Sequence, residues 1–396
     1  MSIEQFDPFS EAFRADPYSF YRAMLAHDVL VVEASPTYTA RYVARHEHVS
    51  ALLRDPHMIH GSNSDWTPPP MADYIAMTRN WMLFRDPPDH TRLRTLVNRA
   101  FTPQAVARLR ERTHMLAHTL LDGIDAAQPF DLISRYAFEL PVQVISEMLG
   151  VPADDRRYFR NWSQALAAAI DFSNSEEPLL RANQATVEMR DYLLRLIAVR
   201  QAAPTDDILS GLLQAEQDGG RLTLDEVFAT CGLLLFAGHE TTVNLIGNGT
   251  LALLRHPEQL ALLTAQPGLM SNAVEEILRY DGPVQATTRR AAQDIALGDA
   301  TLPAGAEVTL VMGGANRDPR VFDRPDDFDI MRTNIRHLAF GAGIHYCVGA
   351  PLARMEGEVG LSALFERLPG LRLEGTPPTW QGVMVLRGLK QLIVQA

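Results

Sequence analysis

The feature that most constrains the fold is a helical hydrophobic period that runs from Pro17 to Arg279 and then stops. In this stretch apolar residues recur roughly every three to four positions, which is typical of amphipathic helices. From residue 283 onward the texture changes to β-branched runs and tight turns such as Leu302-Pro-Ala-Gly305. We find no repeat, low-complexity tract or linker. The sequence therefore predicts one domain over residues 1–396, of class α+β with helices in the majority.

Caps and breakers place the expected elements. A first helix opens at Asp16-Pro17, short strands are expected at 29–32 and 38–43, and a helix at 46–54 ends before Pro56. Residues 55–90 are predicted to form a long irregular stretch. The other predicted helices are 91–99, 103–125, 131–149, 154–170, 177–201, 224–255, 257–265, 268–280 and 349–367. Strands are expected within 283–311, and a hairpin around Arg387-Gly388 ends the chain.

Charge and cysteine content exclude several classes of protein. With 36 basic and 48 acidic residues the net charge is −12, so a phosphate backbone is repelled and nucleic acid is not an expected partner. Cys231 and Cys347 are the only cysteines, which excludes a disulfide scaffold and any cluster held by four of the chain's own thiols. The longest apolar run, 227–238, is shorter than the roughly 20 residues that cross a bilayer. With no signal-peptide pattern at the N-terminus, we expect a cytoplasmic protein with no membrane partner.

One segment, Phe340-Gly-Ala-Gly-Ile-His-Tyr-Cys-Val-Gly349, combines glycines with a cysteine just before a predicted helix. Glycines at 341, 343 and 349 permit positive-φ turns and the close approach of a flat ligand. Amide groups at a helix N-terminus lower the pKa of a thiol and can donate hydrogen bonds to a sulfur anion. This geometry suits a thiolate bound to a metal. For Cys347 taken alone, the alternative is a buried, inert cysteine in a turn.

The pattern Phe340-Gly341-x-Gly-x-His345-x-Cys347-x-Gly349, followed by Leu352-Ala-Arg354, resembles the haem-ligand signature of the cytochrome P450 monooxygenases. The resemblance extends over essentially the whole chain. It implies a helix-rich region and a smaller β-rich region around a buried haem b, with Cys347 as the axial thiolate and metal ligand and O2 as co-substrate. Because the chain has no Cys-x-x-Cys-His, covalent c-type attachment is excluded.

A second motif, residues 237–242, interrupts the apolar run with Ala-Gly-His-Glu-Thr-Thr. A glycine inside a helix costs about 1 kcal/mol relative to alanine. We interpret Gly238, with Ala237, as allowing close approach of the haem, or else a local bulge that leaves a groove for O2. The resemblance implies proton delivery by Glu240 and Thr241, since a carboxylate fed by water and a hydroxyl suit that task. The alternative is a cap or ion pair for Glu240 and a Thr241 hydroxyl bonded to the Ala237 carbonyl. His239 is expected on the helix surface or in a hydrogen bond.

Two buried propionates need partners, because burying an unpaired anion is costly. His90 and Arg94 lie four residues apart on one face of a predicted helix, Arg289 lies in the β region, and His345 lies in the cysteine loop. The resemblance places propionate partners at these positions. Since residues alternate along a strand, only one of Arg289 and Arg290 can face the haem. For each residue a surface ion pair is the alternative.

Three further residues match a structural motif of the family. Glu276 and Arg279 correspond to its Glu-x-x-Arg pair, and Arg332 corresponds to the second arginine of its buried triad. We expect these residues to lock the core on the haem side. Their neighbour Glu275 is expected to be solvated.

Electrons are expected to come from outside the chain. No glycine-rich loop for a flavin or nicotinamide follows a strand, and no cysteine cluster could hold iron–sulfur. The resemblance implies an external ferredoxin and ferredoxin reductase as partners. Four arginines are candidate contacts for an acidic partner, with a solvated basic helix face as the alternative; these are Arg99, Arg108, Arg110 and Arg112.

The expected substrate is an apolar or amphipathic small molecule, because the residues expected to line its pocket are mostly apolar. They are Trp66, Trp81, Leu83, Ile170, Leu233, Leu234, Ala237, Val284, Thr287 and Val385, several of which are alternatively ordinary core. The chain resembles the bacterial group that oxidises macrolides, vitamin D-like sterols and fatty acyl chains. Residues 166–172 and 237–246 resemble the enzymes of biotin synthesis, which cleave fatty acyl chains.

The expected function is therefore a haem-thiolate monooxygenase that inserts one oxygen atom from O2 into a C–H bond. Alternatives that keep the haem thiolate are C–C cleavage, desaturation and peroxide-driven oxidation. The presence of Glu240 and Thr241 argues against a dedicated peroxygenase, which needs no such relay. A more remote alternative is a non-enzymatic haem sensor or electron carrier, which needs neither the relay nor an elongated pocket loop.

Overall fold

A computed structural model describes residues 7–35, 38–61, 69–100, 103–170, 176–217, 220–375, 377–381 and 384–396. Trp66 and residues 171–172, which we expected near the substrate, lie outside the described residues. Long helices make up most of the chain: α4 (Ala72–Arg79), α5 (Asp89–Ala100), α6 (Pro103–Asp122), α7 (Glu139–Met148), α8 (Arg156–Ala168), α9 (Glu177–Ala202), α11 (Leu224–Arg255), α12 (Pro257–Ala265), α13 (Met270–Asp281) and α15 (Ala350–Arg367). Shorter helices are α1 (Glu11–Ala15), α2 (Tyr18–Met24), α3 (His46–Leu52), α10 (Ile208–Gln214) and α14 (Met312–Ala315).

The strands gather into one larger sheet and several small ones. The five-stranded sheet has the order β1 (Leu30–Ser35), β2 (Tyr38–Val43), β10 (Glu307–Val311), β7 (Ala286–Ala291) and β3 (Met58–Ile59). Its pairs are antiparallel except β2 with β10, which is parallel. A three-stranded sheet joins β11 (Arg372–Leu373), β14 (Ile393–Gln395) and β4 (Phe130–Asp131). Two-stranded pairs are β12 (Thr379–Gln381) with β13 (Gly388–Gln391), β5 (Glu216–Gln217) with β6 (Gly220–Arg221), and β8 (Ile295–Leu297) with β9 (Ala300–Leu302).

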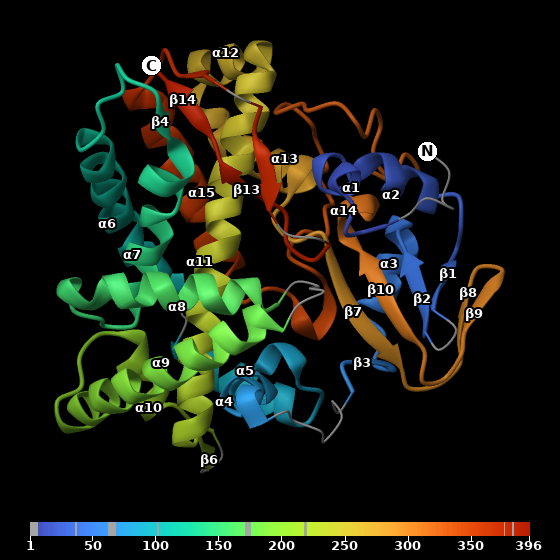
Figure 1. Cartoon of the computed structure of the whole chain (residues 1–396), viewed down its shortest axis with the longest axis horizontal. Helices are drawn as coiled ribbons and strands as arrows, with labels where there is room; N and C mark the ends of the chain where they lie inside the picture. The colour runs from blue at the N-terminus through green and yellow to red at the C-terminus, as the bar shows by residue number, and fades with distance from the viewer. Residues whose placement is uncertain are drawn as a thin grey trace.

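Helix α11 is the central element of the helix-rich part (Figure 1). It begins with a capping box, in which the Thr223 side chain accepts from the Glu226 N–H and the Glu226 carboxylate accepts from the Thr223 N–H. Almost every residue from Val227 to Leu253 is buried, because α7, α8, α13 and α15 pack around it. A helix that is apolar on all sides requires such a surround, and α11 therefore forms the fixed axis on which residues 237–242 are held.

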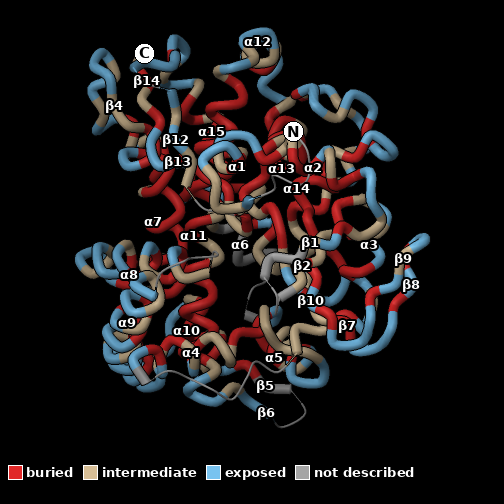
Figure 2. Tube along the Cα trace, turned by 45° about the vertical axis from the view of Figure 1, so that its right-hand side comes forward, coloured by how far each residue is buried: buried red, intermediate tan, exposed pale blue. Residues whose placement is uncertain are grey.

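The β-rich part stands beside the helices, on the right of Figure 1. Its five-stranded sheet has its own core, which includes Val43, Val308 and Leu310 together with Leu52 from α3. Figure 2 shows buried segments concentrated where the elements meet and exposed segments on the outer turns of α8 and α9. The expected class, α+β with helices in the majority, is confirmed. Among the described residues, none of the helices combines the length and the hydropathy needed to cross a membrane.

Several local predictions were wrong. Residues 55–90 are not simply irregular, because they contain β3 and α4, and Tyr74 and Met77 of α4 are buried. Helices α1 and α10 were not predicted, although Ser10 and Asp207 cap them by accepting a backbone N–H. The helix predicted from 131 begins instead with a strand, β4, and a π-helical turn, Ile133–Ala137. Five- and seven-residue helices carry too little periodicity to be seen in a sequence.

Candidate functional site

The shape of the cysteine loop depends on two glycines with positive φ and on one backbone hydrogen bond. The Cys347 N–H donates to the Phe340 carbonyl at 2.9 Å, and Gly341 and Gly343 both have φ of +69°. At Gly343 a side chain is disfavoured by the positive φ and also by the lack of space, since an added Cβ would lie 2.4 Å from the Leu53 carbonyl oxygen. Gly349 differs from the prediction: its φ is −82°, and it serves as the N-cap of α15.

The sulfur of Cys347 lies at the start of α15, as predicted. Backbone N–H groups of Gly349 and Ala350 donate toward it, and Arg94 and Arg354 add positive charge; these contacts lower the pKa of the thiol. Burial acts in the opposite direction and is larger, so the net pKa of the Cys347 thiol is raised, contrary to the lowering that we expected. Cys231 is buried in α11, where burial raises its pKa to about 12, which suits an inert core residue.

Five basic side chains meet beside this loop. The ring centroid of His345 lies 4.2 Å from that of His90 and 4.8 Å from that of His60. Arg94 donates to the Ile344 carbonyl at 3.2 Å. Arg289 donates to the Thr287 hydroxyl at 2.9 Å and to the Thr288 carbonyl at 2.8 Å. The structure thus brings together all four predicted propionate partners and adds His60.

Asp86 offsets part of the positive charge of this cluster but forms no ion pair with it. Within that part, no carboxylate forms an ion pair with His60, His90, Arg94, Arg289 or His345. Burial, with the nearby arginine charges, lowers the pKa of His60 to about 3 and that of His345 to about 2, so both rings are neutral. Burial also lowers the pKa of Arg289 to about 10, although Asp86 opposes this. Asp86 itself accepts the N–H groups of His60 and Gly61.

Unsatisfied nitrogens accompany this charge. Both ring nitrogens of His90 and Nε2 of His60 are buried without a hydrogen-bond partner among the described residues. Each such group costs about 1–3 kcal/mol if it stays unpaired. Two arginines and several imidazole donors, gathered beside a cysteine, fit a ligand that carries two carboxylates. A haem with its two propionates fits this donor set.

His60 was missed by the sequence reasoning because a long-range strand pairing brings it here. Strand β3 pairs with β7 in the register Met58↔Ala291 and Ile59↔Arg290, which carries His60 alongside Arg289. Because side chains alternate along β7, the two adjacent residues Arg289 and Arg290 point to opposite faces of the strand. Arg289 is 5% exposed, whereas Arg290 forms an ion pair with Glu307 at 3.0 Å. No local pattern in the sequence marks His60.

The acid–hydroxyl pair lies midway along α11. Glu240 is 8% exposed and accepts a hydrogen bond from Nε2 of Gln381 at 2.8 Å, and burial raises its pKa to about 7. The Thr241 hydroxyl donates to the Ala237 carbonyl at 2.7 Å, which is the contact we had given as the alternative to a catalytic role. Helix α11 is continuous here, so the bulge considered for Gly238 is absent. An added Cβ at Gly238 would lie 3.3 Å from Cδ1 of Ile145 in α7.

His239 is a buried, hydrogen-bonded residue rather than a surface one. Its Nε2 lies 3.3 Å from the Phe138 carbonyl and its Nδ1 lies 2.5 Å from the Ser163 hydroxyl. Since a carbonyl only accepts, Nε2 carries the hydrogen and Nδ1 accepts from Ser163. Burial lowers the pKa of His239 to about 3. It therefore ties α11 to α8 as a neutral ring.

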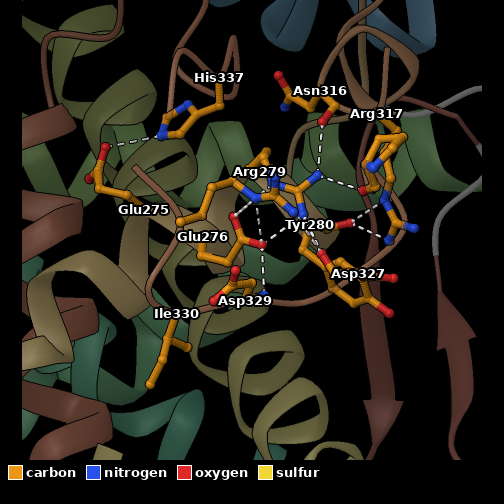
Figure 3. Close-up of polar contacts among 12 residues, drawn as sticks. Glu275, Glu276, Arg279, Tyr280, Asn316, Arg317, Asp327, Asp329, Ile330 and His337 are labelled. Atoms are coloured by element: carbon orange, nitrogen blue, oxygen red, sulfur yellow. Dashed lines mark hydrogen bonds and ion pairs between the residues drawn. The ribbon is translucent and has the colours of Figure 1, made fainter. Parts of the chain in front are cut away.

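The predicted structural triad is assembled around the buried carboxylate of Glu276, which Figure 3 shows beside Arg279. Arg279 donates from Nε and Nη2 to the two oxygens of Glu276, both at 2.7 Å, and Arg332 donates from Nε at 3.2 Å. Glu275 is not solvated, contrary to the prediction. It accepts from Nε of Arg354 at 2.6 Å and from Nε2 of His337 at 3.1 Å, and its pKa is lowered to about 2. Arg354 thus belongs to the cysteine-loop helix and to this network.

The residues predicted for the substrate pocket fall into two groups. Trp81, Leu233 and Leu234 are buried, and the Trp81 ring stacks on Phe236 with centroids 5.5 Å apart. The others are partly exposed: Leu83, Ile170, Ala237, Val284, Thr287 and Val385. A β-bridge between Val284 and Leu386 joins two of the expected pocket segments.

Two of the four arginines suggested for a partner protein are already paired. Arg110 contacts Glu358 at 2.6 Å, and Arg112 contacts Glu147 at 2.8 Å. Arg99 is exposed. Within the cysteine loop, Ile344 and Tyr346 are exposed by 51% and 40%, so the loop reaches the surface.

Known proteins resemble this chain over nearly its whole length. A family model described as cytochrome P450 matches residues 34–266 and 264–379. Cytochrome P450 107B1 of Saccharopolyspora erythraea is 41% identical over 98% of this chain and 96% of its own. Vitamin D(3) 25-hydroxylase of Pseudonocardia autotrophica is 43% identical over 93% and 91%. The crystal structure of P450BioI in complex with an acyl carrier protein ligated to hexadec-9Z-enoic acid superposes with a TM-score of 0.91, at 38% identity, covering 98% of this chain and 100% of that one.

Proposed function

Since this chain belongs to the cytochrome P450 family of monooxygenases, we propose that Cys347 is the axial thiolate of a haem b and that the enzyme inserts one oxygen atom from O2 into a C–H bond of an amphipathic substrate. The observation that carries the proposal is the cluster of His60, His90, Arg94, Arg289 and His345 beside the Cys347 loop. Its two arginine charges lack carboxylate partners within the described part of the chain. Two propionates supply that number of charges.

Each residue has a defined part in holding the cofactor. Arg94 and Arg289 supply the charges that the propionates need, and the imidazoles of His60, His90 and His345 offer N–H donors. Phe340, Gly341 and Gly349 frame the thiolate, with N–H groups of Gly349 and Ala350 donating toward the sulfur. When bound, the haem supplies the O2 activation, and an electron-rich thiolate ligand favours O–O cleavage. Because Ala237 has a small side chain and Gly238 has none, α11 would allow close approach of the haem at these two residues.

Glu240 and Thr241, both in α11, take part in the delivery of protons. A carboxyl with a pKa near 7 can both gain and release a proton at neutral pH, which is the requirement for a repeated donor. The hydrogen of the Thr241 hydroxyl is held by the Ala237 carbonyl, so the oxygen lone pairs are left to accept a hydrogen bond. Thr241 therefore positions a donor rather than supplying the proton itself.

The substrate class we propose is a long apolar molecule with a polar end. The expected pocket side chains are mostly apolar, and Thr287 is the polar exception. Among the relatives, one is named a vitamin D(3) hydroxylase and another holds a sixteen-carbon fatty acid on a carrier protein. Both ligands combine a long apolar body with one polar end. Electrons enter from a ferredoxin and its reductase, at the surface where Ile344 and Tyr346 of the cysteine loop are exposed.

The ligand assignment is tested by spectroscopy of the reduced protein with carbon monoxide. We expect the red-shifted Soret band of a thiolate-ligated haem in the wild type and its loss in Cys347→Ser. Cys231→Ser is the matched control and should keep the band, because Cys231 is a buried core residue. A histidine-like spectrum in the wild type would overturn the assignment of Cys347.

The substrate class is tested by a spectral-shift titration with fatty acids, terpenes, steroids and macrolides. Hexadec-9Z-enoic acid is the first probe. We expect a Soret shift with long amphipathic molecules and none with short polar acids. A response confined to short polar acids would contradict the proposed class. Product analysis of the responsive ligand separates hydroxylation from C–C cleavage and desaturation.

A further inference from the structure

The proton source of Glu240 is not explained by α11 alone. Glu240 is 8% exposed, so it cannot exchange protons freely with bulk water. A group that gives up protons in every turnover must recover them. Its neighbour one turn along the helix, Asn244, acts on the Glu240 carboxylate but is itself 1% exposed, so it offers no route to solvent. Asn244 also packs against Gly388.

A hydrogen bond to Glu240 from outside α11 comes from the C-terminal hairpin. Gln381, the last residue of β12, donates from Nε2 to Oε1 of Glu240 at 2.8 Å. In this hairpin β13 packs against α11 and β12 packs against α1. The hairpin is therefore inserted between the N-terminal segment and the long helix. Gln381 occupies the point at which these three parts of the chain meet.

Gln381 also lines a small cavity. The cavity has a volume of about 10 Å³, enough for about one water molecule. Its polar lining comes from Arg14, Gln285 and Arg387 as well as Gln381. Gln285 is 2% exposed, and its Oε1, which lies against Gly313, has no hydrogen-bond partner among the described residues. Gln381 is therefore in contact with both this cavity and Glu240.

We propose that Gln381 is a positioning residue that holds Glu240 and controls its access to water in this cavity, so that protons return to Glu240 from the hairpin side of the molecule. When the Gln381 amide turns away, a water molecule reaches the carboxylate. The water relays a solvent proton: one of its O–H bonds breaks as an O–H bond forms on Glu240, and in the same step the water takes up a proton from solvent, so that no hydroxide forms and no electrons move. The proposal rests on the role proposed above for Glu240.

Two substitutions at Gln381 separate water access from simple support. Gln381→Met removes the hydrogen bond but keeps the side-chain volume, so it blocks the cavity. Gln381→Ala removes both and opens the cavity onto Glu240. Gln391→Met is the matched control, because Gln391 is exposed on β13 of the same hairpin and its backbone pairs with Thr379.

The measurements use the haem-loaded enzyme with NADPH, an added ferredoxin and reductase, and the fatty acid probe. We expect Gln381→Met to lower the rate of NADPH oxidation about two- to tenfold, the range of one hydrogen bond, and to raise the solvent isotope effect. Gln381→Ala should recover part of the rate, because water then reaches Glu240 directly. An infrared carboxyl band that disappears in Glu240→Gln should shift in Gln381→Met and stay unchanged in Gln391→Met.

The outcomes separate this proposal from the role of Glu240. If Glu240→Gln changes neither the rate nor the isotope effect, the role of Glu240 fails and the proposal fails with it. If Glu240→Gln is impaired but Gln381→Met matches Gln391→Met, only the proposal for Gln381 is overturned. A Gln381→Ala variant as slow as Gln381→Met would also overturn it, since water access would then not limit the reaction. The Soret band of the carbon monoxide complex checks that each variant holds haem, and Gln381→Asn, which keeps the amide but shortens its reach, replaces Gln381→Met if that variant does not.

Discussion

Arg279 and Glu276 form a two-pronged ion pair in which neither side chain is exposed to solvent. The pair is closed by backbone carbonyls of Asn316, Pro325 and Asp327, each of which accepts from Arg279. This arrangement fastens α13 to the loop that leads toward the cysteine segment (Figure 3). Because charge buried in pairs is tolerated only while both partners are present, the pair is sensitive to neutralisation of either member.

We therefore expect Glu276→Gln to lower the free energy of unfolding by about 3–5 kcal/mol, because it leaves a buried guanidinium unpaired. Glu307→Gln is the control. Glu307 and its ion-pair partner Arg290 are 47% and 41% exposed, so its loss should cost at most about 1 kcal/mol. Denaturant unfolding of the haem-loaded proteins gives both values. Equal losses in the two variants would show that the buried Glu276–Arg279 pair contributes no more to stability than an exposed ion pair.

We expect substitution of Arg289 to have opposite effects on the stability of the haem-free protein and on the binding of haem. Without haem its charge is buried and has no carboxylate partner in the described chain, so Arg289→Gln should leave the apoprotein as stable as the wild type or more stable. With haem the same change removes a charge-assisted hydrogen bond, which is worth about 1.5–3 kcal/mol, or roughly 10- to 100-fold in affinity.

The measurement is the rate of haem transfer to an excess of apomyoglobin, together with thermal unfolding of the apoprotein. Arg290→Gln is the matched control and should behave as the wild type, because Arg290 forms an ion pair with Glu307 away from the cluster. Faster haem loss from Arg290→Gln than from Arg289→Gln would reverse the assignment of the two arginines.

The cysteine loop offers a comparison between two glycines with the same backbone angle. Gly341 and Gly343 both have φ of +69°, but only Gly343 abuts backbone, with 2.4 Å between an added Cβ and the Leu53 carbonyl oxygen. At Gly341 the nearest atom is 3.9 Å away. Gly341→Ala should cost about 1 kcal/mol from the backbone angle alone, and Gly343→Ala about 2 kcal/mol more. The unfolding midpoint of the loaded protein checks this; equal costs would mean that the Leu53 contact is relieved freely.

Thr241→Ala should divert reducing equivalents to peroxide, because the hydroxyl oxygen that orients a proton donor is lost. Thr241→Ser keeps the oxygen and is expected to remain coupled. The measurement is the ratio of product and of peroxide to NADPH consumed. Unchanged coupling in Thr241→Ala would leave its bond to the Ala237 carbonyl as the whole role of Thr241.

The parts of the fold that the sequence predicted are those with local signals. Helix α11 was expected at 224–255 and α12 at 257–265, and the structure has both at these bounds, with a capping box of Thr223 and Glu226 at the start of α11 and Pro257 in the first turn of α12. Helix α4 was missed because Pro68, Pro69 and Pro70 precede it and suggest a loop. A pattern of breakers hides a helix that is stabilised mainly by burial of its inner face.

The site divides in the same way. Cys347, Glu240 and Thr241 stand in contiguous motifs, so their neighbourhood could be predicted. His60 reaches the cluster through the β3–β7 pairing, Glu275 is bound by Arg354 at a separation of 79 residues, and Gln381 reaches Glu240 from 141 residues away. These contacts depend on how distant segments pack, and no local pattern encodes them. Glu275 was expected to be solvated as the neighbour of Glu276, and its contacts with Arg354 and His337 contradict that expectation.

The stability of the protein should depend on pH through Glu240. Burial raises the pKa of Glu240 from 4.5 to about 7 in the folded protein. The folded state therefore holds this proton more tightly than the unfolded state. The stability that Glu240 contributes as a protonated carboxyl is fully present below pH 4.5. It is lost as pH rises from 4.5 toward 7, and above pH 7 no further stability is lost. At about 1.4 kcal/mol for each pKa unit, the loss amounts to about 3 kcal/mol.

The measurement is the difference in unfolding free energy between the wild type and Glu240→Gln at several pH values from 5 to 8. We expect the wild type to lose about 2–3 kcal/mol relative to the variant across this range. Glu226→Gln, the same change on the same helix, is the control. The contact with Arg92 helps to hold the pKa of Glu226 below its ordinary value, so that carboxyl is ionised in both states above pH 5 and its difference should be flat. A flat difference for Glu240→Gln as well would show that Glu240 is hydrated in the folded enzyme and that its pKa is close to that of a free carboxyl.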